Sequence, residues 1–350
     1  MFTSKITFVV PAYNVADYIE ECLQSIVDQT NENWNLIIVN DGSTDGQTGL
    51  ICEKFAKAYP QKIKYIYQKN QGLGAARNKG MQFVETPYVD FLDSDDWLPP
   101  NYVQRFYEEI ERIGVQSVDM IFTLPVIYDN LEKRCYDWYD KALLLSIFKE
   151  QTIVSPRINK KLYELEVNAC RKIYSTTFLG NLDFQFPEGV KWEDVYPHFY
   201  LLSKADYCLG ITDIGFYYRI NTSGQITKST GRGRLDMVKV FAQTFNYLIT
   251  NSAEEDIIFC AMNTLVSFSF WSIDVANMDV RKELVDKLSI LYRALPDKYI
   301  ELFKNRCNSK NQKLFIFCMR KPFLRKLFYD YYHMKKMSSA VERIRKLCRR

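Results

Sequence analysis

The chain has 350 residues, a net charge of +4, 47% hydrophobic residues and 25% charged residues. These values are typical of a globular protein with one large or two moderate domains, and they exclude a largely disordered or collagen-like chain. No apolar run approaches the roughly 18 residues needed to cross a bilayer, and the N-terminus lacks the layout of a secretory signal. We therefore expect a soluble or peripheral protein.

The first hundred residues alternate between two hydrophobic periods. Continuous apolar runs indicate strands buried on both faces, and apolar residues at helical spacing indicate helices. The predicted strands are Lys5–Val10, Asn35–Val39, Ile63–Tyr67 and Tyr88–Leu92, and the predicted helices are Asp17–Thr30, Gln47–Tyr59 and Leu73–Val84. This βαβαβαβ order predicts an α/β fold with a mainly parallel sheet and helices on both faces.

Polar loops follow three of the four predicted strands, at Pro11–Asn14, Asn40–Asp45 and Asp93–Asp96. In parallel sheets, ligands bind beyond the carboxyl ends of the strands. The sequence therefore predicts a ligand site where these three loops meet.

The periodicity becomes less regular after residue 100. Residues 99–230 mix helix and strand, and the sequence from about Gly231 onward is nearly all helical, with an interruption at Gly231–Arg234. We therefore expect a domain at 1–230, made of halves 1–98 and 99–230, and a helical region at 231–350.

Charge is unevenly distributed along the chain. Residues 310–350 contain 13 Lys and Arg against Asp330 and Glu342, a net charge of +11, which leaves −7 for residues 1–309. This basic tail fits either a solvated helix face or an amphipathic surface that docks on anionic lipid. The acidic body argues against a nucleic-acid partner.

The available side chains restrict the kind of metal site. Nine scattered cysteines with no CxxC pair indicate reduced thiols in a cytoplasm and no structural zinc. With two histidines in the chain, a metal site must use carboxylates, which favours Mg²⁺ or Mn²⁺. Asp93-Ser94-Asp95-Asp96 offers such carboxylates at a strand end, although it could also cap a helix over Trp97–Arg112.

Two other segments fall near the predicted site. Asn40–Asp45 is a turn by composition, but its place after the second strand makes Asp41 a candidate acceptor for a base or a ribose. Asn70–Asn78 opens the third helix and lacks a GxGxxG fingerprint. It is expected to bring backbone N–H groups and Arg77 near anionic phosphates.

Four motifs occur in the order and spacing of a known enzyme family: Val10–Asn14, Asn40–Asp45, Gly74–Asn78 and Asp93–Asp96. In these motifs the chain resembles the family 2 glycosyltransferases of the GT-A fold, especially the bacterial members that build capsule, exopolysaccharide or surface glycans. The resemblance covers about residues 5–230.

The resemblance implies a donor site for a UDP-sugar. Pro11, Tyr13 and Asp41 would hold the uracil and ribose, Arg77 would lie near the nucleotide, and Asp93 would lie near the ribose. Asp95 would bind Mn²⁺ or Mg²⁺ that bridges the diphosphate, where negative charge develops as the sugar bond breaks.

A second acidic point completes the predicted site. Lys191–Asp194 resembles the Glu-Asp motif in which Asp194 would be the general base of an inverting enzyme, supported by Trp192 and Glu193. Taken alone, this segment is more typical of an ordinary helix cap.

Tyr217–Thr227 resembles a pattern that closes over the diphosphate. Arg219 fits that pattern and Gln225 departs from it, whereas we expect His198 to be a packing residue.

The implied function is metal-dependent inverting transfer of a hexose or N-acetylhexosamine to a hydroxyl of a growing surface glycan. The acceptor would be linked to lipid or protein, and the enzyme would be cytoplasmic or peripheral at the inner face of the membrane. The sequence is also compatible with a homodimer. Two other functions are alternatives. A catalytically silent accessory subunit would be expected to lack Asp95 or Asp194, and a sugar-nucleotide nucleotidyltransferase would need a basic Gly-rich loop after the first strand.

Overall fold

The computed structural model describes residues 4–114, 118–149, 152–321 and 324. The chain divides into two compact units, Met1–Ile226 (unit 1) and Thr227–Arg350 (unit 2). The division falls a few residues before the interruption at Gly231–Arg234 from which the sequence boundary was inferred.

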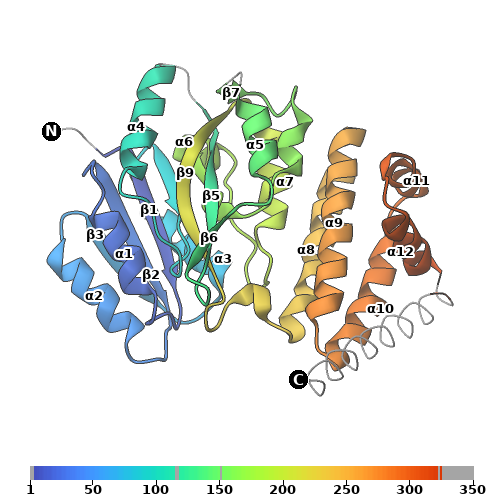
Figure 1. The fold of residues 1–350 in the computed structure, drawn as a ribbon, viewed down its shortest axis with the longest axis horizontal. Helices are drawn as coiled ribbons and strands as arrows, with labels where there is room; N and C mark the ends of the chain where they lie inside the picture. The colour runs from blue at the N-terminus through green and yellow to red at the C-terminus, as the bar shows by residue number, and fades with distance from the viewer. Residues whose placement is uncertain (1–3, 115–117, 150–151, 322–323, 325–350) are drawn as a thin grey trace. The chain divides into compact units, whose positions relative to one another are not determined.

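Unit 1 begins with the predicted alternation of strands and helices (Figure 1). The strands are β1 (Ile6–Ala12), β2 (Trp34–Asp41), β3 (Ile63–Gln68) and β4 (Tyr88–Phe91), and the helices are α1 (Ile19–Val27), α2 (Thr48–Ala58) and α3 (Leu73–Met81). The four strands pair in parallel in the order β3-β2-β1-β4. The predicted parallel sheet is confirmed.

Helices cover both faces of these strands because successive strand side chains point in opposite directions. Phe8 and Val10 belong to an apolar cluster that also contains residues of α1 and α2. Val9 and Val39 lie against α3, where a Cβ added to Gly80 would come within 2.4 Å of Val9. This close approach requires glycine, and burying an aliphatic side chain of this size contributes about 1.5–3 kcal/mol.

The second half of unit 1 extends the sheet with mixed pairing. Its elements are α4 (Tyr102–Ile113), β5 (Met120–Asp129), β6 (Arg134–Asp137), α5 (Lys141–Phe148), β7 (Ile153–Val154), β8 (Lys172–Ser175), α6 (Thr176–Asn181), α7 (Val195–Lys204) and β9 (Cys208–Ile220). β8 runs antiparallel between β4 and β5, and β5 pairs in parallel with β9. The polar ends of β5 and β9 are thereby brought toward the loop that follows β4.

The helix predicted at Trp97–Arg112 begins later than expected, at Tyr102. Trp97 instead pairs with Tyr217, whose N–H donates to the Trp97 carbonyl at 2.8 Å. Residues that precede prolines disfavour helical geometry, and Pro99-Pro100 lies between Trp97 and the helix. The interpretation of Asp93–Asp96 as the cap of that helix is therefore wrong.

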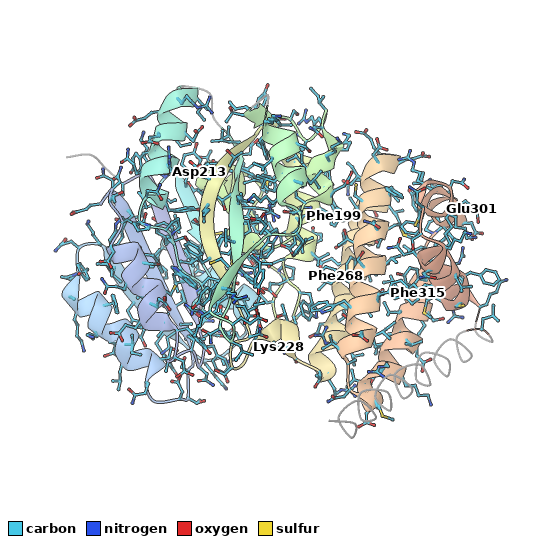
Figure 2. The ribbon with its side chains drawn as sticks, in the orientation of Figure 1. Phe199, Asp213, Lys228, Phe268, Glu301 and Phe315 are labelled. Carbon is cyan, nitrogen blue, oxygen red and sulfur yellow. The ribbon has the colours of Figure 1, made fainter. Side chains whose placement is uncertain are left out.

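Unit 2 is helical throughout its described part. Its helices are α8 (Asp236–Thr250), α9 (Glu255–Val275), α10 (Met278–Ala294), α11 (Asp297–Arg306) and α12 (Lys310–Arg320). α9 is long and apolar enough to cross a membrane by length and composition, yet 56% of its apolar window is buried within the fold. The stick view shows the aromatic side chains of this unit (Figure 2), among which the rings of Phe270 and Phe315 have centroids 4.6 Å apart.

The first part of the predicted basic tail is a packed helix. Phe315, Ile316 and Met319 of α12 are buried, and the Ser289 hydroxyl donates to the Met319 carbonyl at 2.6 Å. The prediction that the basic tail starts at Lys310 is therefore corrected, because α12 is part of the packed helical unit. Residues 325–350, which carry most of its charge, lie outside the described residues.

Candidate active site

The loops after β1 and β2 are tied together by hydrogen bonds. Asn14, which has a φ of +52°, accepts from the backbone N–H groups of Thr44 and Asp45 at 2.7 and 3.2 Å. Nearby, Pro11 is buried in β1 and the Tyr13 side chain is 46% exposed. The structure therefore leaves an aromatic ring accessible at the carboxyl end of β1, where a base was predicted to bind.

Asp41, the last residue of β2, is 3% exposed and engaged with the protein. Its carboxylate accepts from the N–H groups of Gln71 and Gly72, each at 2.9 Å, and from Gln68 Nε2 at 2.7 Å. Two N–H groups predicted to face phosphates are thus already bound. Asp41 holds the β3–α3 connection, and its direct contact with uracil or ribose stays a prediction.

The loop Asp93–Asp96 leaves β4 as predicted and carries three carboxylates. Asp95 Oδ2 accepts from the Thr222 hydroxyl at 3.4 Å, and Asp96 Oδ1 accepts from the Arg219 N–H at 2.8 Å. Burial, with the nearby charge of Asp93, raises the pKa of Asp95 to about 6. A cation bound beside the Asp95 carboxyl group would favour its ionised form.

Arg219 supports this loop from β9. Its Nε donates to the Asp95 carbonyl at 2.8 Å, its Nη2 lies 2.6 Å from Glu21 Oε2, and its guanidinium lies 4.3 Å from the centre of the Trp97 ring. The residue is 5% exposed. The guanidinium therefore braces the Asp93–Asp96 loop, and the contact of Arg219 with the nucleotide sugar stays a prediction.

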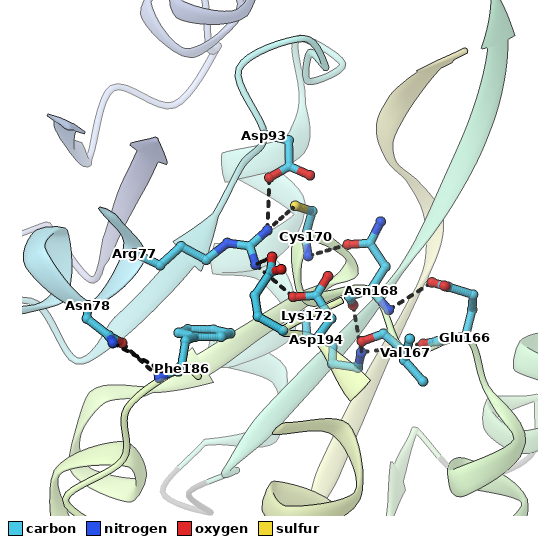
Figure 3. Close-up of polar contacts among 11 residues, drawn as sticks. Arg77, Asn78, Asp93, Glu166, Val167, Asn168, Cys170, Lys172, Phe186 and Asp194 are labelled. Carbon is cyan, nitrogen blue, oxygen red and sulfur yellow. Dashed lines mark hydrogen bonds and ion pairs between the residues drawn. The ribbon is translucent and has the colours of Figure 1, made fainter. Parts of the chain in front are cut away.

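Arg77 of α3 joins the two acidic points of the predicted site (Figure 3). Nη2 lies 2.9 Å from Asp93 Oδ1, and Nη1 lies 2.9 Å from Glu193 Oε1 and 2.7 Å from Asp194 Oδ1. The side chain is fully buried. The cationic end of Arg77 thus faces carboxylates, and its place near the nucleotide stays a prediction. We name Arg77, Asp93, Glu193 and Asp194 the Arg77 cluster.

The backbone before α7 directs Glu193 and Asp194 toward Arg77. Trp192 has a φ of +69°, a left-handed conformation that is uncommon for a bulky residue and is often found at functional sites. Asp194 occupies the N-cap position of α7 but makes no capping hydrogen bond with its side chain. Its carboxylate is 20% exposed, whereas the Glu193 side chain is 6% exposed and burial raises its pKa.

The Gly74–Asn78 motif serves to dock the segment that carries Asp194. Asn78 Nδ2 donates to the Phe186 carbonyl at 2.9 Å, and Asn78 Oδ1 accepts from the Phe186 N–H at 2.8 Å. A Cβ on Gly74 would lie 2.1 Å from the Pro187 carbonyl oxygen. Gly74 and Asn78 therefore hold the Phe186–Pro187 segment against α3, whereas the approach of the Asn70–Asn78 segment to phosphates stays a prediction.

The side chains at the end of β4 fit a hard divalent cation. Asp93 and Asp95 provide carboxylate oxygens, the donors that Mg²⁺ and Mn²⁺ prefer. Asp96 Oδ2 is a buried oxygen that accepts no hydrogen bond from the part of the chain that the structure describes. Within the described ranges, no group of three His, Cys, Asp or Glu side chains could hold an ion by itself. The donor set suits a metal that takes its remaining ligands from a diphosphate.

Several polar residues of the site gave no signal in the sequence. Cys170 Sγ lies 3.7 Å from Arg77 Nη2, and the buried ammonium of Lys172 donates to the carbonyls of Val167 and Asn168 at 2.9 and 2.6 Å. Both belong to a short stretch without a motif. His198, by contrast, is a buried packing residue as expected, in ring contact with Phe199.

A cavity of about 320 Å³ lies elsewhere in unit 1, beside the first residues of β9. Its lining charges pair with one another, as in the 3.1 Å contact between Arg105 and Asp213. Asp213, labelled in Figure 2, lies in the first half of β9, whereas Arg219 lies near the end of that strand. The cavity is therefore separate from the Arg77 cluster.

Comparison with known proteins identifies the family to which this arrangement belongs. Residues 7–163 match the family model described as Glycosyl transferase family 2. This part of the chain belongs to the family 2 glycosyltransferases. The chain is 33% identical to Glycosyltransferase GlyA of Streptococcus pneumoniae serotype 4 over 212 residues, which are 57% of this chain and 28% of GlyA.

A second relative of this glycosyltransferase is the Minor teichoic acid biosynthesis protein GgaB of Bacillus subtilis. The two are 35% identical over 238 residues, which are 66% of this chain and 25% of GgaB. The matched regions thus span about a quarter of the length of these curated relatives. By its name, GgaB belongs to minor teichoic acid biosynthesis.

The fold of this glycosyltransferase is GT-A, as the sequence predicted. It resembles the crystal structure of S. aureus TarS 1–349 in complex with UDP, with a TM-score of 0.69, 21% identity, and coverage of 97% of this chain and 92% of that chain. TarS has also been solved in complex with UDP-GlcNAc. At this identity the similarity establishes the fold alone.

Proposed function

We propose that this glycosyltransferase is a metal-dependent inverting enzyme that uses a UDP-sugar donor. The observation that carries the proposal is Arg77, which bridges Asp93 at the end of β4 and Asp194 before α7 with contacts of 2.9 and 2.7 Å. Arg77 thereby fixes the Asp93 carboxylate, on the side of the donor, and the partly exposed Asp194 carboxylate. In-line displacement needs such an arrangement, with leaving group and base on opposite sides of the anomeric carbon.

Asp194 would act as the general base. Its Oδ1 receives the Arg77 hydrogen bond, and its Oδ2 has no hydrogen bond to the rest of the described chain. That oxygen is suited to take the proton from an acceptor hydroxyl as the hydroxyl oxygen attacks the sugar. Glu193 is buried on the same guanidinium and would help to position it.

Asp95, with Asp93 beside it, would hold Mg²⁺ or Mn²⁺. Such an ion, when bound, neutralises the charge that develops on a departing diphosphate. The protein's own part is to orient these carboxylates, which it does through Arg219 and Thr222. Tyr13, which is exposed after β1, would stack on the base of the donor. Asp41 would hold the β3–α3 connection beside the nucleotide.

The finer features of the substrates also belong to this proposal. The transferred group would be a hexose or N-acetylhexosamine, and the acceptor a hydroxyl of a growing surface glycan on a lipid or protein carrier. The teichoic acid relative GgaB supports a surface-glycan acceptor, and the UDP-bound structural neighbour TarS supports a UDP-sugar donor. Cytoplasmic activity at the inner face of the membrane is the location that suits a lipid-linked acceptor.

A catalytically silent accessory subunit is disfavoured, because the carboxylates and their supporting contacts are present together. A nucleotidyltransferase is also disfavoured, since the loop after β1 is Tyr13-Asn14-Val15 and not a basic Gly-rich loop.

The test is a panel of UDP-hexoses and UDP-N-acetylhexosamines incubated with and without Mn²⁺, scored for UDP release. We expect one donor to be turned over with metal and not with EDTA, and turnover by Asp95→Asn to be lower by orders of magnitude. NMR of the first-released sugar should show inversion of the donor's anomeric configuration. Retention, or full activity of Asp95→Asn in EDTA, would refute the proposal.

A further inference from the structure

A second cluster of side chains adjoins the Arg77 cluster, in the half of unit 1 that follows β4. Its centre is Trp138–Asp140, directly after β6. The Trp138 ring is 4% exposed, stacks on the Tyr139 ring at 4.9 Å and meets the Tyr218 ring edge-on at 5.2 Å. Tyr139 itself is 70% exposed. The Tyr139 ring is therefore accessible to solvent and is held in place by the buried Trp138 ring.

Charged groups with unused hydrogen-bonding atoms lie next to this ring. Asp140 Oδ2 accepts from Arg171 Nη1 at 2.5 Å and from the Glu166 N–H at 2.8 Å. Arg171 is fully buried, yet its Nε and Nη2, like Asp140 Oδ1, have no hydrogen-bond partner within the described residues. Buried polar atoms of this kind usually find a partner, so they mark a polar network enclosed behind the exposed ring.

The chain connects this cluster to both halves of the catalytic site. Cys170 contacts Arg77, and the next residue, Arg171, binds Asp140. On the other side, Tyr218 directly precedes Arg219, which holds the loop of Asp95. Burial and the charge of Asp96 raise the pKa of Tyr218, as expected for a phenol facing that loop. The cluster therefore borders the base and the donor loop at once.

We propose that Tyr139, supported by Trp138, is an acceptor subsite that stacks on a pyranose ring of a neutral glycan. The inference rests on the proposed function and adds the chemical class of the acceptor. Binding sites combine aromatic surface with a few placed polar groups, and the carboxylate of the partly exposed Glu166 can accept a sugar hydroxyl. An acceptor made of alditol phosphates is disfavoured, since like charges repel and the neighbouring cation Arg171 is buried on Asp140.

The experiment uses the full chain with UDP and Mg²⁺ and two probes, cellotetraose and a glycerol phosphate octamer. Calorimetry should give binding of cellotetraose, weakened about tenfold in Tyr139→Ala and kept in Tyr139→Phe, which retains the ring. Tyr67→Ala is the matched control, because Tyr67 is 65% exposed on β3 at the far edge of the sheet. UDP affinity should be the same in all variants.

Binding of the glycerol phosphate octamer in place of cellotetraose, binding of neither probe, or equal cellotetraose affinity in Tyr139→Ala would each overturn the subsite. Failure of the proposed function would look different. In that case the wild-type chain would not bind UDP at all, whatever the result with the saccharide.

Discussion

At the scale of single residues, Arg77 is the group on which the site depends most. Its guanidinium meets carboxylates that are 16, 116 and 117 positions away in the sequence. The sequence pointed to Asp93, Asp95 and Asp194 through their motifs. It did not reveal that Arg77 joins Asp93 to Asp194, because spacing along the chain carries no information on a contact formed between distant loops.

Arg77→Gln should destabilise unit 1 and abolish turnover. Removing one partner of a buried ion pair costs about 3–5 kcal/mol, because the remaining charges stay buried. Arg77→Lys should recover part of the stability and little of the activity, since an ammonium cannot reproduce a planar fork. Thermal unfolding and UDP release measure the two effects.

The matched control is Arg105→Gln, which removes an arginine that is 46% exposed in a surface ion pair. It should change the melting temperature very little. If Arg77→Gln behaved like this control in both assays, the central role of Arg77 would be contradicted.

Asp90 should make stability depend on pH. It is buried in β4, accepts from the Tyr102 hydroxyl, and burial raises its pKa from 3.8 to about 7. A raised pKa means that its contribution to stability is full at low pH and is lost as the pH rises through about 7. Between pH 5 and 7 the loss amounts to about 2 kcal/mol.

Asp90→Asn removes this titration while keeping the shape of the side chain. The melting temperature of the variant relative to wild type should therefore rise from pH 5 to pH 7, and the exposed Asp28→Asn should show no such trend. A pH-independent difference between Asp90→Asn and wild type would show that Asp90 does not titrate in this range.

At the scale of elements, periodicity predicted β1 to β4 and α1 to α3 to within a few residues, because β1, β2 and β4 are buried apolar runs and α1 and α2 are amphipathic. The start of α4 was missed because Trp97 pairs with β9, a tertiary contact that overrides local preference. The Gly74–Asn78 motif was placed correctly at the start of α3. Its contact with the Phe186–Pro187 segment was not predicted, because that segment carries no recognisable pattern.

Gly74→Ala tests this docking role. The new methyl group would clash with the Pro187 carbonyl and push the segment before Asp194 away from α3. We expect turnover to fall at least tenfold and the melting temperature to drop, while UDP binding persists. Gly180→Ala, in a helix where a Cβ meets nothing within 4 Å, is the control and should be neutral or slightly stabilising. Equal turnover by the two variants would contradict the docking role.

At the scale of the whole molecule, the chain is a GT-A unit and a helical unit that ends in a basic segment. Residues 325–350 contain nine Lys and Arg against Asp330 and Glu342. Near an anionic membrane, each basic residue contributes about 1 kcal/mol. We expect the full chain to sediment with phosphatidylglycerol vesicles at low salt and to be released at high salt.

A chain ending at Lys321 keeps α12 and should lose vesicle binding while retaining UDP binding and its melting temperature. Aggregation of that shorter chain, together with no vesicle binding by the full chain, would decide for a purely structural role of the segment.

The central claim is that Asp194, held by Arg77, is the base of a single displacement on a UDP-sugar. The most direct measurement is the turnover of Asp194→Asn with the accepted donor, under saturating UDP-sugar. Loss of a general base lowers the rate about 10²–10⁴-fold, and because the base acts on the acceptor, the affinity for UDP should stay at the wild-type value. Turnover within a few-fold of wild type would contradict the account.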